Sequence, residues 1–145
     1  MEENNEFLLY LYKITDMGIT SMKTLVDIIK DKDNKIINLL YEELNEYKDS
    51  LEKVKDIMKT RGLKKPSDEI LRDLGVSANM HMELMKDNSD ARIAEMLING
   101  YTMGIIELKK NIEKYESNIT PEERKIAEEI SKYQNKNLKK LKKYL

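Results

Sequence analysis

The 145-residue sequence contains no cysteine, no tryptophan and a single histidine, His81. Without cysteine the chain has no disulfides, thiolate metal sites or cysteine nucleophiles. A lone histidine excludes multi-histidine metal sites and leaves histidine-based triads without support. Glycine (5), proline (2) and phenylalanine (1) are scarce, while leucine, isoleucine, lysine, glutamate and methionine dominate. This composition favours helix over strand.

The chain also lacks an excess of either charge and any long apolar run. Its 26 Lys and Arg against 27 Asp and Glu give a formal net charge of −1. Such a balance requires neither a polyanion nor a polycation as partner. No apolar run approaches the ~18–20 residues that cross a bilayer. Three of the first six residues are glutamate and none is basic, unlike the basic start of a secretory signal. We expect a cytoplasmic protein with no membrane span.

Apolar residues recur in steps of three and four along most of the sequence, which predicts long packed helices. We expect helix 1 over about 3–30, helix 2 ending at Arg61-Gly62, helix 3 over about 90–115, and helix 4 from Pro121 to the C-terminus. Asp31 or Asp33 is expected to cap helix 2, and Thr120-Pro121-Glu122-Glu123 predicts a capped helix start with a capping box. The predicted inner face of helix 3 includes Gly100 and Gly104.

The pattern weakens between Leu63 and Asn88, where Pro66-Ser67-Asp68 starts a shorter helix interrupted by Gly75. We expect a single domain, 1–145, with hairpin 1 at about 3–61, a crossover at about 62–88 and hairpin 2 at about 89–145. The crossover can travel the length of a bundle, since about 19 helical residues span ~28 Å. The predicted fold class is all-α: a ferritin-like four-helix bundle of two antiparallel hairpins, with an additional short helix in the crossover.

The two predicted hairpins align with each other through one constant shift. Met17-Gly18-Ile19 matches Met103-Gly104-Ile105, and the difference between 104 and 18 is 86. The same shift places Glu42-Glu43-Leu44 and Tyr47 on Glu128-Glu129-Ile130 and Tyr133. Apolar matches arise easily between amphipathic helices, but these polar and glycine matches do not. We therefore predict an internal repeat in which each glycine allows a close helix approach.

The segment from Ile93 to Leu108, IAEMLINGYTMGIIEL, together with the order of the hairpins, resembles the ferritin-like superfamily. The resemblance is closest to small bacterial ferritin-like proteins of unknown function, including clostridial ones. It covers essentially the whole chain at the level of topology and rests mainly on packing residues. It implies a fold and assigns no activity.

A ferritin-like di-iron site uses a Glu from each of two helices and Glu-x-x-His from the other two. Here Glu43 and Glu129 occupy equivalent positions, but Glu46 and Lys132 stand three residues later, where histidines are needed. Glu107 is the further acidic candidate. The metal candidates are therefore Glu43, Glu107 and Glu129, with iron as the implied metal. The simpler interpretation is that these acids flank the core and are solvated or paired with lysines.

Tyr47 and Tyr133 fall on the predicted inner face, and Tyr101 lies near it. A buried tyrosine needs a partner for its hydroxyl, and Glu43 and Glu129 lie one turn from Tyr47 and Tyr133. An inner polar network of Tyr47 and Tyr133 is one hypothesis. The alternative, which has more support, is that the rings fill space and direct their hydroxyls to solvent.

The remaining candidate residues favour structural roles. His81 among Met80, Met82 and Met85 is more typical of adaptable packing than of a soft-metal site. Lysines crowd the C-terminal end (Lys136, Lys139, Lys140, Lys142, Lys143), which suits the C-terminal end of a helix dipole better than nucleic-acid binding. A second apolar stripe on helix 1 predicts a homodimer or a contact with the crossover helix.

The preferred functional interpretation is a non-catalytic bundle that serves as a structural or protein-interaction module. No phosphate-binding loop or nucleophile elbow is present, so catalytic and cofactor-binding residues are predicted to be absent. The alternative is a metal-binding, di-iron-like oxidoreductase or iron-handling protein with a degenerate carboxylate site.

Overall fold

The computed structural model describes residues 3–66, 83–84 and 86–145. In this part of the chain four α-helices are present and no residue lies in a strand. They are α1 (Glu3–Ile29), α2 (Ile37–Thr60), α5 (Asp90–Lys114) and α6 (Pro121–Leu141), and a 3-10 turn (Lys142–Tyr144) follows α6. The predicted all-α class is confirmed, and the arrangement is compatible with a four-helix bundle.

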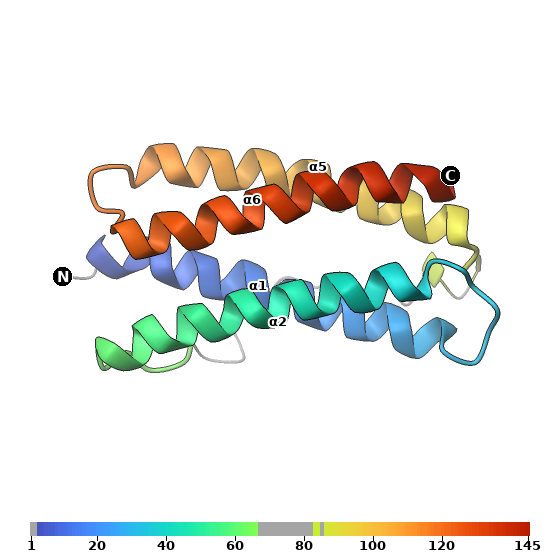
Figure 1. Cartoon of the computed structure of the whole chain (residues 1–145), viewed down its shortest axis with the longest axis horizontal. Helices are drawn as coiled ribbons and strands as arrows, with labels where there is room; N and C mark the ends of the chain where they lie inside the picture. The colour runs from blue at the N-terminus through green and yellow to red at the C-terminus, as the bar shows by residue number, and fades with distance from the viewer. Residues whose placement is uncertain (1–2, 67–82, 85) are drawn as a thin grey trace.

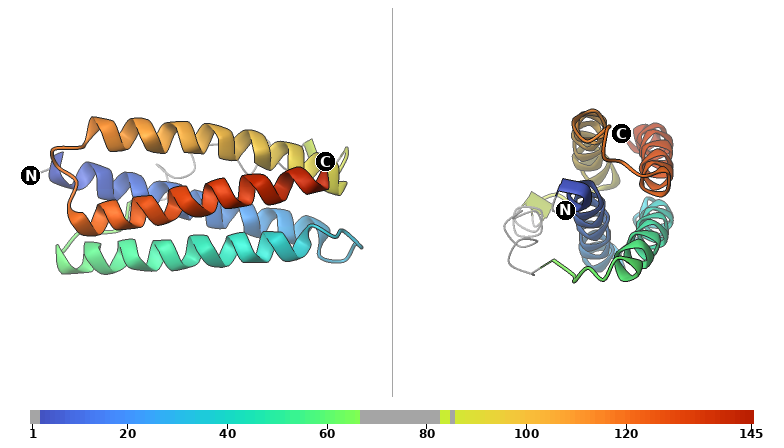
Figure 2. Two further views of the ribbon diagram at one scale, coloured as in Figure 1. Left: turned by 45° about the horizontal axis from the view of Figure 1, so that its top comes forward. Right: turned by 90° about the vertical axis from the view of Figure 1, so that its left-hand side faces the viewer.

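The helices form two antiparallel pairs, α1 with α2 and α5 with α6 (Figure 1). The helices α2 and α5, one from each pair, run in the same direction. α2 ends where α1 begins, and α5 starts at the opposite end of the bundle. In the end-on view, α5 and α6 lie against α1 and α2 around a shared interior (Figure 2). The additional short helix predicted after Pro66 falls largely outside the described residues.

Local sequence signals fix three helix ends as predicted. The Ser89 hydroxyl accepts a hydrogen bond from the Arg92 amide at 3.3 Å, and Thr120 accepts one from Glu123 at 3.2 Å. Each cap satisfies an amide that the first helical turn leaves free. At the end of α2, Gly62 has φ +68°, and the Leu63 amide donates to the Met58 carbonyl at 2.9 Å. This left-handed glycine ends α2 as expected.

The start of α2 differs from the prediction, because neither Asp31 nor Asp33 caps it. The N-cap is Ile36, which makes no side-chain cap. Asp90, at the start of α5, accepts hydrogen bonds from the Lys35 amide at 3.0 Å, the Ile36 amide at 3.4 Å and the Asn34 side chain at 3.0 Å. A carboxylate near exposed amides of a helix start is favourable. The cap therefore comes from the second hairpin rather than from the preceding loop.

Glu123 also departs from the prediction, since its carboxylate does not close a capping box with Thr120. It is fully buried and pairs with Arg61, at 3.1 Å between Oε1 and Nη2. Arg61 donates a second hydrogen bond to Asn5 Oδ1 at 3.3 Å. The end of α2 is thus joined to the start of α1 and the start of α6.

The core is a continuous apolar cluster to which all four helices contribute. Seven predicted inner residues of α1 are buried: Leu8, Leu11, Thr15, Gly18, Met22, Leu25 and Ile29. On α5 the predicted inner Gly100 is exposed, and the neighbouring Tyr101 is buried instead. Among the described helices, none combines the length and apolar character that a membrane span requires.

Gly18 of α1 packs tightly against the ring of Tyr47 of α2. A methyl group on Gly18 would lie 2.5 Å from ring carbons of Tyr47, whose ring is buried. We expect Gly18→Ala to lower the unfolding free energy by about 1–3 kcal/mol, the usual effect of overpacking a core. Urea unfolding monitored by circular dichroism measures this change.

Gly100 provides the matched control, because a methyl group there meets nothing within 4 Å. Gly100→Ala should raise the unfolding free energy by about 0.5–1 kcal/mol, since alanine favours the helix. Equal stabilisation by both substitutions would show that α1 and α2 do not approach as closely as described.

Candidate functional site

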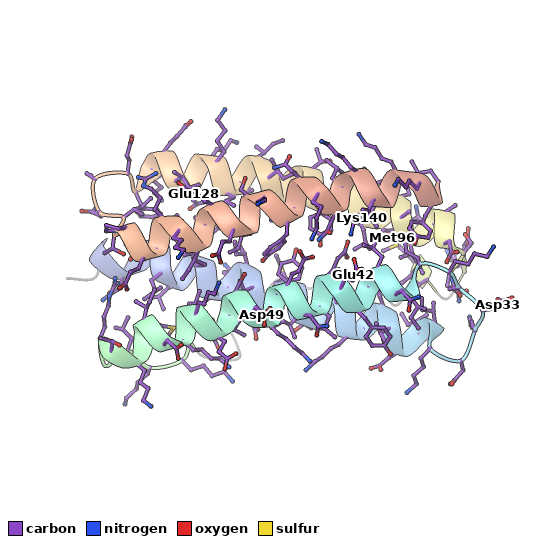
Figure 3. All side chains as sticks on the ribbon, viewed as in Figure 1. Asp33, Glu42, Asp49, Met96, Glu128 and Lys140 are labelled. Atoms are coloured by element: carbon purple, nitrogen blue, oxygen red, sulfur yellow. The ribbon has the colours of Figure 1, made fainter. Side chains whose placement is uncertain are left out.

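The two hairpins meet along α2 and α6, where three ion pairs lie on the outer side of the interface in the described structure. Lys53 pairs with Glu129 at 2.8 Å, Lys140 with Glu42 at 3.1 Å, and Lys136 with Glu46. Figure 3 shows Glu42 and Lys140 pointing toward each other across the two helices. The two residue numbers of each pair add up to 182. The pairs therefore share one antiparallel register.

Beneath this interface the bundle interior contains a group of polar side chains within the apolar core. We define the polar centre as Glu43 and Tyr47 of α2, Tyr101 of α5, and Tyr133, Gln134 and Asn137 of α6. All six residues are buried, and Glu43 and Asn137 are 0% exposed. The Tyr47 and Tyr133 rings pack edge-to-face with centroids 5.4 Å apart.

Several oxygens of the polar centre have no hydrogen-bond partner within 3.5 Å among the described residues. They are both carboxylate oxygens of Glu43, the hydroxyls of Tyr101 and Tyr133, Gln134 Oε1 and Asn137 Oδ1. Burying a polar group without a partner costs free energy, and native proteins contain few such groups. Their concentration in one place is the chemically distinctive feature of this interior.

Asn137 is oriented by the ion pair above it. Its Nδ2 donates to Glu46 Oε1 at 2.9 Å, and Glu46 Oε2 is held by Lys136. With the amide nitrogen used in this way, Oδ1 is the atom left in the interior. The surface pair therefore positions an inward-facing acceptor.

The environment of Glu43 favours its neutral form. Burial raises the pKa of Glu43 to about 8, and the charge of nearby Glu46 acts in the same direction. The Tyr101 hydroxyl lies near enough to oppose this rise, although the two groups make no hydrogen bond within 3.5 Å. Burial likewise raises the pKa of the Tyr47, Tyr101 and Tyr133 hydroxyls. At neutral pH the centre is therefore mostly protonated.

The three predicted metal candidates lie in different environments. Glu43 is fully buried, Glu107 is exposed on α5, and Glu129 is partly exposed and paired with Lys53. The described residues contain no group of three or more His, Cys, Asp or Glu that could hold a metal ion. Glu43, Glu107 and Glu129 therefore do not form such a group in the part of the chain that the structure describes.

Sequence reasoning missed Gln134 and Asn137 and left Tyr101 at the margin. The inner face of helix 4 was assigned from its apolar residues alone. Such an assignment cannot identify buried amides, so it did not predict the burial of Gln134 and Asn137. Position 101 did carry a signal, because it lies four residues from both Leu97 and Ile105. His81, Met80, Met82 and Met85 lie outside the described residues.

The C-terminal lysines partly serve the bundle itself. Lys136 and Lys140 form the ion pairs with Glu46 and Glu42 described above. Lys139, Lys142 and Lys143 are exposed. Two of the five lysines in this cluster are therefore used in ion pairs between α2 and α6.

Comparisons with protein-family models, curated proteins and solved structures give no match for this chain.

The position of Glu43 predicts a specific pH dependence of stability. The folded carboxyl holds its proton up to pH about 8, against 4.5 for the ordinary group. Folding therefore binds a proton between these values, and the unfolding free energy falls as pH rises through this window. Glu43→Gln should remove that fall and be more stable than the wild type at about pH 9, by roughly 2–5 kcal/mol.

Urea unfolding between about pH 5 and 9 measures this pH dependence of the unfolding free energy. The buffers contain choline as their only cation. Glu129→Gln is the matched control, because Glu129 is partly exposed and salt-bridged; it should change stability by less than about 1 kcal/mol. Parallel pH profiles for the wild type and Glu43→Gln would contradict the burial of an unpaired carboxyl group.

Proposed function

We propose that this chain is a non-catalytic, ferritin-like bundle of the cytoplasm that acts as a structural or protein-interaction module and forms a homodimer. The observation that carries the interaction is an apolar strip on α5. Met103 is 68% exposed and Ile106, one turn further on, is 49% exposed. Covering such side chains is favourable at about 25 cal/mol per Å² of apolar surface.

The ferritin-like part of the proposal is supported by the directions of the helices. The last helix of the first hairpin, α2, and the first helix of the second, α5, run in the same direction. Joining them needs one connection along the bundle, as in ferritin-like folds. The proposed internal repeat agrees with the helix bounds. Shifted by 86, α1 would cover 89–115, against Asp90–Lys114 for α5.

The alternative, a di-iron-like oxidoreductase or iron-handling protein, has one supporting observation. Glu43 is a buried carboxyl group without a hydrogen-bond partner among the described residues. The exposure of Glu107 and the ion pair of Glu129 with Lys53 weigh against it. The interaction module is therefore the better-supported proposal.

A double substitution, Met103→Glu with Ile106→Glu, tests the dimer. Two carboxylates on the strip should oppose its burial against a second copy, because charges are costly to desolvate. We expect the wild type to show a mass that rises to that of a dimer with concentration in sedimentation experiments. The variant should remain monomeric and keep the unfolding midpoint that the wild type shows at low concentration, where it is a monomer.

Tyr41→Glu is the control, since Tyr41 is 45% exposed on α2 and lies outside the strip. It should dimerise like the wild type. A wild type that stays monomeric at every concentration, or a double variant that still dimerises, would refute the proposed homodimer.

A further inference from the structure

The polar centre contains more hydrogen-bond acceptors than donors. Four of its unpartnered oxygens can only accept hydrogen bonds when Glu43 is ionised: both Glu43 oxygens, Gln134 Oε1 and Asn137 Oδ1. The other two are the hydroxyls of Tyr101 and Tyr133, each with one proton to donate. No unpartnered buried side-chain nitrogen is found among the described residues. With Glu43 ionised, the centre is therefore complementary to a positive group.

Two of these groups, Glu43 and Asn137, come from different helices and meet at Tyr101. The Tyr101 hydroxyl interacts with the Glu43 carboxyl of α2 and with the Asn137 side chain of α6. Gln134 lies one turn from Asn137 on the same helix and faces α5, where its Nε2 is 3.3 Å from the position of a methyl group on Gly104. Three helices thus bring carboxylate, amide and phenol oxygens into one interior region.

The donor set and its charge define the class of ligand. Oxygen ligands suit hard cations, whereas zinc and copper sites use histidine or cysteine. Glu46 is already neutralised by Lys136. The single uncompensated negative charge of the centre is that of ionised Glu43, which one monovalent cation balances.

We propose that the polar centre binds one alkali-metal cation, K⁺ or Na⁺, through Glu43, Asn137 and Tyr101, with Gln134 as a further oxygen ligand. The bound cation would satisfy acceptors that no described protein group satisfies. It would also join α2, α5 and α6 and so hold the two hairpins together. This site is independent of the proposed dimer, because its ligands are buried within one chain.

Thermal unfolding at constant ionic strength tests the proposal, with K⁺ or Na⁺ replacing choline at about pH 9 so that protons do not compete for Glu43. A cation that binds only the folded state raises the unfolding midpoint as its concentration rises above Kd. We expect this rise for the wild type and for the control Glu129→Gln. Glu43→Gln should lose it.

Asn137→Leu is a second variant, because leucine occupies the equivalent position, Leu51, of the first hairpin. It should also lose the response to K⁺ and Na⁺ while still unfolding cooperatively. An equal midpoint in choline, K⁺ and Na⁺ would overturn the proposal, as would an unchanged ion response in Glu43→Gln. A response to Mg²⁺ or Ca²⁺ alone would overturn the monovalent assignment.

Discussion

The antiparallel contact between α2 and α6 is the interaction on which the rest of the bundle depends. Each hairpin alone would leave an apolar face in water, and this contact is where the two hairpins cover each other. Its ion pairs share one register, so a shift of one helix along the other would break all of them together. Exposed pairs contribute little stability individually. Their consistent register instead selects one alignment, and that alignment places Asn137 on Glu46 and Tyr47 against Tyr133.

The interior is divided between apolar packing and a polar centre. On α2, Leu40 precedes Glu43 by one turn, and Leu51 and Val54 follow Tyr47 toward the other end of the helix; all are buried. The hydrophobic contribution of these apolar parts offsets the cost of burying polar atoms between them. The polar centre is also asymmetric under the shift of 86, because Tyr101 and Asn137 correspond to Thr15 and Leu51. Thr15 donates its hydroxyl to the Leu11 carbonyl at 2.8 Å within its own helix. At these two positions, therefore, only the second hairpin supplies oxygens to the polar centre.

Much of the fold could be predicted from the sequence because its signals are local. Ser89, Thr120 and Gly62 act on amides or carbonyls within a few residues, and the helix ends they mark were predicted closely. Asp90 and Glu123 act on groups more than fifty residues away. Glu123 was predicted to close a local capping box instead, and the contact of Asp90 was not predicted. The polar centre was only partly predicted. Glu43, Tyr47 and Tyr133 stood out by their spacing, whereas Gln134 and Asn137 are buried by contacts that no periodicity encodes.

The Asp90 contact has a consequence for how the chain folds. The α1–α2 hairpin forms through contacts between neighbours in sequence, which form quickly. The hydrogen bonds from Asn34 and Lys35 to Asp90 span 55 or 56 residues, and the α2–α6 ion pairs span 76 to 98. Closing loops of this length costs entropy before any contact repays it. We therefore expect docking of the two hairpins to be the slow step, with the hydrogen bonds at the start of α2 completed only when Asp90 of α5 reaches them.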